Sequence, residues 1–289
     1  MGVGSGTGGR AGIQVRRLAG IITAVTAAAP PDQVLSYARL VTGRIRGGLG
    51  GRLLAAYLHG SAVLGGWRAD RSDVDMLFVT EDGADSQDID ALSAALTASA
   101  AEAPGHGLES SAVTAGQAAQ PRAPWPFLLH VAVDLAGPQD PGGARIVAVR
   151  GDRQPGDPDL LMHYAVCRAA GWAVHGPGPR ELIGAVPRPA ILGYLADELG
   201  WGLEHGTEAY AVLNAGRAQV FLADGRIVSK IEGGRIALAR GFGPPTVLRR
   251  ALDQQQGRAT ERPAGEDAVG YVQAVAGYLR SAAEAAGPG

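Results

Sequence analysis

Two short groups of polar residues, Gly60-Ser61 and Asp73-x-Asp75, are of the types and spacing that bind a metal ion together with a phosphate chain. The first pair ends one apolar run and the second begins another, so both lie at the ends of expected strands. Alternate side chains of a strand point the same way, and the two aspartates therefore share one face. Carboxylates this close repel one another unless a cation lies between them, and such oxygen ligands suit Mg²⁺. Because Gly60 permits close backbone approach and Ser61 offers N–H and O–H donors, a triphosphate fits beside the metal, and nucleotidyl transfer is the expected chemistry.

This pair of motifs resembles the signature of the polymerase-β-type nucleotidyltransferases. The flanking segments HGSAVLGGW and SDVDMLFV are more similar still to the aminoglycoside (3'')(9) O-adenylyltransferases. The segments DPDLLMHYAVCRAAG, EAYAVLNAGRAQVFLADGRIVSK and YVQAVAGYL resemble the second half of those enzymes in the same order, so the resemblance covers about residues 32–285. It implies transfer of AMP from ATP and Mg²⁺ to a hydroxyl of an aminoglycoside or aminocyclitol such as streptomycin or spectinomycin. The alternative interpretation of the two motifs is a hairpin with surface acids.

A third carboxylate, Glu109, lies on the next expected strand, where it can point at the same site. By resemblance, LESSAVTAG matches the strand that carries the family's catalytic glutamate, which acts as general base toward the antibiotic hydroxyl and contacts a second metal. The alternative is a surface acid at the start of a strand. Ser72, just before the first aspartate, is a candidate phosphate contact.

Positive charge for the triphosphate is expected from the second half of the chain. Arg217 and Lys230 fall where the family places an arginine and a lysine on the nucleotide phosphates, and Asp159 matches a family acid near the nucleotide. Arg217 could instead lie on a solvated helix face, and Asp159 could be a helix cap only. Lys230 is the only lysine of the chain, which is either chance or a position where a compact ammonium is needed and a guanidinium does not serve.

A polycationic acceptor requires an acidic pocket with aromatic walls. Asp197, Trp201, Glu204 and Glu208 share one face if their segment is a continuous helix. Trp201 matches a tryptophan at the family's drug site, Glu204 and Glu208 lie near the family's drug-binding aspartates, and Trp125 resembles another drug-contacting tryptophan. The alternatives are a solvated acidic face and, for Trp125, an anchor in the core.

Two further residues bear on the nucleotide end. Leu252 stands where related enzymes carry a tyrosine that stacks on the nucleotide, so the contact to adenine is not carried over. His59, next to Gly60, is expected to be a strand-end histidine packed beside the site and not a catalytic group.

The hydrophobic periodicity predicts the elements that position these residues. The expected elements are helices over 32–46 and 86–101, strands over 53–59, 74–79, 108–114, 130–135 and 146–149, and helices from 158 to about 174 and over 190–205, 208–222 and 268–285. We therefore predict an α/β (α+β) nucleotidyltransferase domain with a mixed sheet over 32–156 and an all-α helical bundle over 157–289. The active site is expected between them, and residues 1–31 are expected to be a flexible N-terminal extension.

The composition of the chain limits which binding partners and which cellular location can be expected. With 289 residues and a net charge of −2, there is no electrostatic case for nucleic acid as the main partner. A single cysteine, Cys167, precludes an intrachain disulfide and favours the cytoplasm. Residues 16–30 resemble a signal peptide, but ATP is supplied inside the cell, and no apolar stretch approaches the ~20 residues of a membrane span.

We expect a monomer that uses ATP as co-substrate and Mg²⁺, with two ions bound. Two alternatives stay open at this point. The same chemistry could act on another acceptor, either a different natural product or a protein hydroxyl. A non-catalytic nucleotide-binding relative is disfavoured because Asp73, Asp75 and Glu109 are all present.

Overall fold

The computed structural model describes residues 28–135 and 144–287, and within these residues six strands form one mixed sheet in the order β5-β4-β3-β2-β1-β6. Strands β2 and β3 are parallel, whereas the other neighbouring strands are antiparallel. The parallel pair requires a crossover, which helix α3 supplies. The strands are β1 (Leu53–Leu58), β2 (Asp73–Thr80), β3 (Gly107–Thr114), β4 (Leu129–Leu135), β5 (Ala144–Arg150) and β6 (Trp172–His175).

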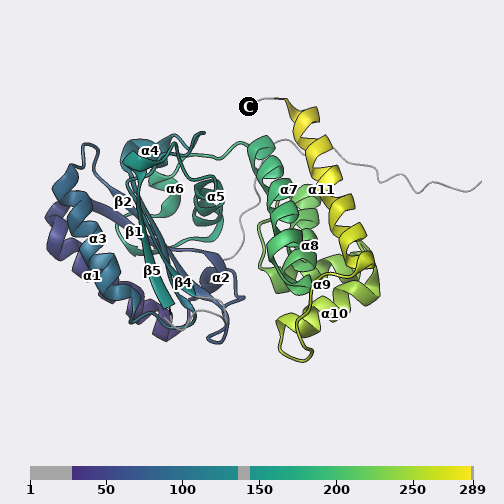
Figure 1. Cartoon of the computed structure of the whole chain (residues 1–289). Coiled ribbons are helices and arrows are strands. Elements are labelled where there is room, and N and C mark those ends of the chain that lie inside the picture. Colours follow the sequence, from purple (N-terminus) through teal and green to yellow (C-terminus); the bar gives the residue numbers. More distant parts are fainter. Residues whose placement is uncertain (1–27, 136–143, 288–289) are drawn as a thin grey trace, which may run out of the picture.

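Two long helices, α1 (Asp32–Leu49) and α3 (Ser86–Ala100), cover one face of this sheet (Figure 1). The buried residues of α1 recur every three or four positions, which is the spacing of one helix face. The Asp85 side chain accepts hydrogen bonds from the first turn of α3 and so begins that helix. The opposite face carries α5 (Leu160–Ala170) and the short helices α4 (Ala115–Ala119) and α6 (Pro179–Leu182). The short helix α2 (Gly60–Val63) follows β1, and its buried side chains pack in the cluster beneath α1 and α3.

The remainder of the described chain is helical and lies beside the sheet domain (Figure 1). Its helices are α7 (Arg188–His205), α8 (Glu208–Asp224), α9 (Lys230–Arg240), α10 (Pro245–Gln255) and α11 (Glu266–Ala286). Helix α8 packs against all four of the others. A single buried apolar cluster runs from the second face of the sheet through α5 into this bundle, so the two parts share a core. The predicted class, a mixed-sheet domain followed by a helical bundle, is confirmed.

The predicted division of the chain needs correction. The helix expected from 158 to about 174 ends at Ala170, and the residues that follow form β6, which pairs with β1. Gly171 ends the helix because its backbone turns back on Cys167, leaving no room for a side chain. Helix α5 and β6 therefore belong with the sheet, and the all-helical part begins at Arg188 and not at residue 157.

The N-terminal prediction lies largely outside the described residues, which exclude 1–27. Of the segment 1–31, Ala28 donates a backbone hydrogen bond to the Val63 carbonyl at 2.9 Å, so its last residues lie against α2. Among the helices within 28–135 and 144–287, none combines the length and apolar character needed to cross a bilayer.

Candidate active site

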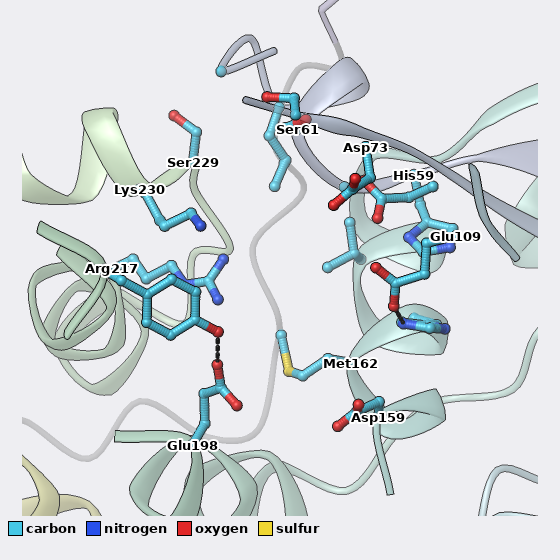
Figure 2. Close-up of a pocket in the computed structure, with 18 of the residues that line it drawn as sticks. His59, Ser61, Asp73, Glu109, Asp159, Met162, Glu198, Arg217, Ser229 and Lys230 are labelled. Atoms are coloured by element: carbon cyan, nitrogen blue, oxygen red, sulfur yellow. Dashed lines mark hydrogen bonds and ion pairs between the residues drawn. The ribbon is translucent and has the colours of Figure 1, made fainter. Parts of the chain in front are cut away.

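A cavity of about 540 Å³ opens between the sheet domain and the helical bundle. Figure 2 shows its two walls: Asp73, Glu109 and Asp159 on the sheet side, facing Glu198, Arg217 and Lys230 on the helical side. The sequence-predicted residues that line it are Gly60, Ser61, Ser72, Asp73, Asp75, Glu109, Asp159, Trp201, Arg217 and Lys230.

Strand register brings the three carboxylates together. Asp75 and Glu109 are register partners on the parallel strands β2 and β3, so their side chains leave the same face of the sheet. Asp73 lies two residues before Asp75 on that face. Gly60 stands against them with φ +61°, and a Cβ built there would lie 1.9 Å from Asp75 Oδ2. Only glycine allows the backbone to pass this close to the carboxylate.

Burial raises the pKa values of all three carboxylates, and repulsion between them adds to the shifts of Asp75 and Glu109. Burial raises the pKa of Asp75 well above its ordinary value, and the neighbouring Glu109 and Asp73 raise it further. Burial likewise raises the pKa of Asp73. The pKa of Glu109 is raised to about 7, first by burial, with Asp73 among the charges that add to the shift. A bound cation would relieve this repulsion.

The donor set fits Mg²⁺ that shares its coordination with phosphate. Within the described residues, no three His, Cys, Asp or Glu side chains are arranged to enclose a metal by themselves. Mg²⁺ commonly binds through one or two carboxylates and takes its other ligands from water and substrate phosphates. Asp73 and Asp75 would hold the ion in this way, with Glu109 beside them.

The opposite wall carries two cations from different helices. Arg217 comes from α8, and its Nε is buried without a hydrogen-bond partner within 28–135 and 144–287. Lys230 is the first residue of α9, and its Nζ lies 4.6 Å from the centre of the Tyr210 ring. Burial and the Arg217 guanidinium lower the pKa of Lys230 to about 8. Ser229, which caps α9, lies next to Lys230 on the helical side, across the cavity from Ser61 (Figure 2). The two walls thus place positive charge opposite the carboxylates.

The lower part of the cavity combines acids with aromatic rings. The Tyr210 hydroxyl donates to Glu198, and the Tyr194 hydroxyl donates to Asp159 Oδ1 at 2.7 Å, which joins α7 to the chain just before α5. Trp201 is 51% exposed, and its ring lies 5.8 Å from that of Tyr210. The sequence interpretation missed Glu198, Tyr194 and Tyr210. The spacing of Tyr194, Glu198 and Trp201, at i, i+4 and i+7 on α7, was the available signal.

Histidine 163, also missed from the sequence, stands behind Glu109. Its Nε2 lies 3.7 Å from Glu109 Oε1, and its ring packs 4.7 Å from that of His59. Burial lowers the pKa of both histidines. His59 is 3% exposed and therefore packs beside the site, as predicted for a strand-end histidine.

Three predicted acceptor-site residues do not line the cavity. Glu208 is the clearest correction: α7 ends at His205, Thr207 caps a new helix, and the Glu208 side chain turns into the bundle. There it is fully buried and accepts hydrogen bonds from Arg250, Arg262 and the Gly265 N–H. Glu204 and Trp125 also lie outside the cavity. Glu204 is exposed, whereas Trp125 packs half-buried against the core.

The structure also places two residues that the sequence analysis considered for nucleotide binding. The Ser72 Oγ accepts a hydrogen bond from the Arg68 N–H at 3.0 Å, so this hydroxyl helps to hold its own loop as well as lining the cavity. Leu252 is 7% exposed and packs in the bundle core. It therefore takes no part in the cavity surface.

The mixed sheet with its C-terminal helical bundle is the nucleotidyltransferase fold with a helical domain. The chain is similar to the crystal structure of spectinomycin adenyltransferase AAD(9) from Enterococcus faecialis with ATP and spectinomycin. The TM-score is 0.57 at 16% sequence identity, and the alignment covers 86% of this chain and 98% of that chain. No protein-family model and no curated protein matches the sequence. At this identity the likeness establishes the fold.

Proposed function

We propose that the protein transfers AMP from ATP to a hydroxyl group of an aminoglycoside or aminocyclitol antibiotic. The observation that carries the proposal is the single cavity in which Asp73, Asp75 and Glu109 face Arg217 and Lys230. A carboxylate cluster opposite two cations suits a metal-bound triphosphate and few other ligands. The neighbouring structure, an adenyltransferase with ATP and spectinomycin, supports the same chemistry.

The charged residues on the two walls of the cavity have distinct roles in this reaction. Asp73 and Asp75 would hold Mg²⁺, which when bound neutralises phosphate charge and orients the triphosphate. Arg217 and Lys230 bind the phosphates and stabilise the negative charge that develops on the leaving pyrophosphate. Glu109 accepts the proton of the attacking hydroxyl. Its pKa of about 7 suits a general base near neutral pH.

The acceptor is a cation because its end of the cavity is acidic. Glu198 and Asp159 face this space, each with a tyrosine hydroxyl that fixes its orientation. The exposed Trp201 ring offers a face on which a sugar or cyclitol ring and its ammonium groups can lie. Glu198 thus takes the place that the sequence interpretation had given to Glu204 and Glu208.

The two walls also imply an order of binding. Since the phosphate-binding cations and the carboxylates come from different domains, ATP bound between them holds the domains together and completes the acceptor site. We therefore expect ATP with Mg²⁺ to bind first. Acceptor affinity that is identical with and without a non-hydrolysable ATP analogue would contradict this order.

The decisive experiment is a panel of aminoglycosides and aminocyclitols incubated with ATP, Mg²⁺ and the purified protein, followed by mass spectrometry. The proposal predicts that at least one compound gains the mass of an AMP group, and that the Asp75→Asn variant forms none of this product. Modification of no panel member would contradict the acceptor class. AMP found instead on another natural product or on a protein would establish the same chemistry with a different acceptor.

A further inference from the structure

A side chain of the sheet domain that lines the cavity also binds the helical bundle. Arg71 Nη1 lies 2.8 Å from Glu261 Oε1 and 3.3 Å from the Gln254 carbonyl oxygen. Gln254 lies in the last turn of α10, where helix carbonyls carry partial negative charge and favour a cation. We call these three residues the Arg71 bridge.

The loop that carries Arg71 is held firmly at its sheet end. The Ser72 N–H donates to the Arg68 carbonyl at 2.9 Å, and the His106 N–H donates to the Ser72 carbonyl at 3.0 Å. The residue after Ser72 is Asp73, the first carboxylate of the site. Any movement of Arg71 relative to the bundle is therefore passed to the start of β2.

The bundle end of the bridge is equally fixed. Arg262, next to Glu261, donates to the fully buried Glu208, and the Arg262 carbonyl accepts from the Glu208 N–H at 2.8 Å. The Gly265 N–H donates to the same carboxylate. Glu261 consequently stands on a segment anchored in the bundle and not on a free loop.

A second contact lies in the same loop. A Cβ built on Gly66 would come within 2.9 Å of Ser229 Cβ, so the loop packs directly on the residue that caps α9. Lys230 follows Ser229. The loop thus contacts the bundle at two points, one beside Lys230 and one at the end of α10.

We infer that Arg71 is a positioning residue, which through the Arg71 bridge sets the distance between the carboxylates of the sheet and the cations of the bundle. The inference rests on the proposed function, because the distance matters for a triphosphate that spans both walls. Arg71 also lines the cavity, so direct binding of phosphate by its guanidinium is the competing explanation. The two explanations differ in what they require of Glu261, which does not line the cavity.

The test measures the affinity of ATP with Mg²⁺ by calorimetry, without acceptor, in a double-mutant cycle. If the bridge positions the domains, Glu261→Gln weakens binding by about two- to fivefold, the range expected for a partly exposed ion pair. Arg71→Gln weakens it by at least as much, and Glu261→Gln has no further effect in the Arg71→Gln background. If Arg71 instead binds phosphate directly, Glu261→Gln leaves affinity unchanged or improves it, because a negative charge has been removed. That result would overturn the inference.

Asp253→Asn is the matched control. It removes the same charge from the same region, but Asp253 pairs with Arg258 within the bundle and does not cross to the sheet domain. Its ATP affinity should be that of the unmodified protein. Unchanged affinity in Glu261→Gln, as in Asp253→Asn, would refute the bridge.

These measurements need no transfer reaction, so their failure is distinguishable from failure of the proposed function. If no antibiotic is modified while the cycle shows coupling between Arg71 and Glu261, the bridge stands and the acceptor assignment falls. If AMP transfer is found while Glu261→Gln behaves as the Asp253→Asn control, the proposed function stands and the Arg71 bridge falls.

Discussion

ATP binding is expected to become weaker at alkaline pH because of Lys230. Its ammonium is partly withdrawn from water and lies near Arg217, and together these lower its pKa to about 8. The bound triphosphate brings several negative charges to the same wall, which favours the protonated lysine. The pKa of Lys230 therefore rises on binding, and between the free and bound values ATP binding takes up a proton.

The size of the effect follows from the free-state value. With a pKa of about 8, about nine tenths of Lys230 is charged at pH 7 and about one tenth at pH 9. If ATP binds only the charged form, its dissociation constant rises about tenfold between these two pH values, which corresponds to about 1.4 kcal/mol. At pH 8, about half a proton should be taken up per ATP bound.

Calorimetry at each pH, repeated in buffers with different ionisation enthalpies, measures both quantities. Lys230→Arg is the control, because a guanidinium stays charged throughout this range. Glu109 and ATP titrate in the same way in both proteins, so their effects cancel in the ratio of the two dissociation constants. The change of this ratio with pH therefore reports the titration of Lys230 alone. A ratio that does not change from pH 7 to 9 would refute the reasoning, and it would mean that Lys230 is charged in the free protein or does not contact phosphate.

Three further outcomes test other parts of the site. Asp75→Asn should abolish AMP transfer without changing the far-ultraviolet circular dichroism spectrum, and near-normal turnover would remove this residue from the metal site. Glu109→Gln should still bind ATP with Mg²⁺ but should lose about 10²–10⁴-fold in kcat, the range typical of a general base; an unchanged kcat would make Glu109 a bystander. Glu208→Gln should lower the free energy of unfolding by about 1–3 kcal/mol, because Arg250 and Arg262 lose their charged partner, while the KM for the acceptor stays within about twofold. A large increase in the KM for the acceptor, with an unchanged free energy of unfolding, would indicate that Glu208 contacts the acceptor.

That Gly60, Ser61, Asp73 and Asp75 lie together was predictable from sequence because their geometry is local. Gly60-Ser61 and Asp73-x-Asp75 are each short motifs at strand ends, and the period of two in a strand determines which side chains share a face. Glu109 was placed on the correct strand for the same reason. The strand boundaries differ from the prediction by about one or two residues, which is the usual uncertainty at element ends.

The proposed acceptor end was less predictable because it depends on where helices end. The acidic face assumed from Asp197 to Glu208 requires one continuous helix, but Thr207 caps a second helix and turns Glu208 into the core. Because α7 ends before Thr207, Glu208 can turn inward and pair with Arg250 and Arg262. No local sequence pattern indicates this pairing. Glu198 was overlooked because its role depends on Tyr210, which lies on the next helix.

The sixth strand was missed for a related reason. Residues 172–175 follow a helix directly and are too few to show a clear alternation of apolar residues. Their strand conformation comes from pairing with β1, a contact more than a hundred residues away in sequence. Expectations of a monomer, of two Mg²⁺ ions and of a cytoplasmic location stay predictions.

The register between β2 and β3 determines where the chain can tolerate insertions and deletions. The separation of Asp75 and Glu109 is fixed by backbone hydrogen bonds between adjacent strands. Residues 81–106, which connect the two strands and include α3, lie on the face of the sheet opposite the two carboxylates. Residues can therefore be inserted into or deleted from this connection without altering the spacing of the two carboxylates. By contrast, a shift of β3 by a single residue along β2 would turn Glu109 to the opposite face, into the core beneath α3. Random insertion libraries should accordingly accept changes in length in the loop before α3, and should reject them within the eight residues of β3.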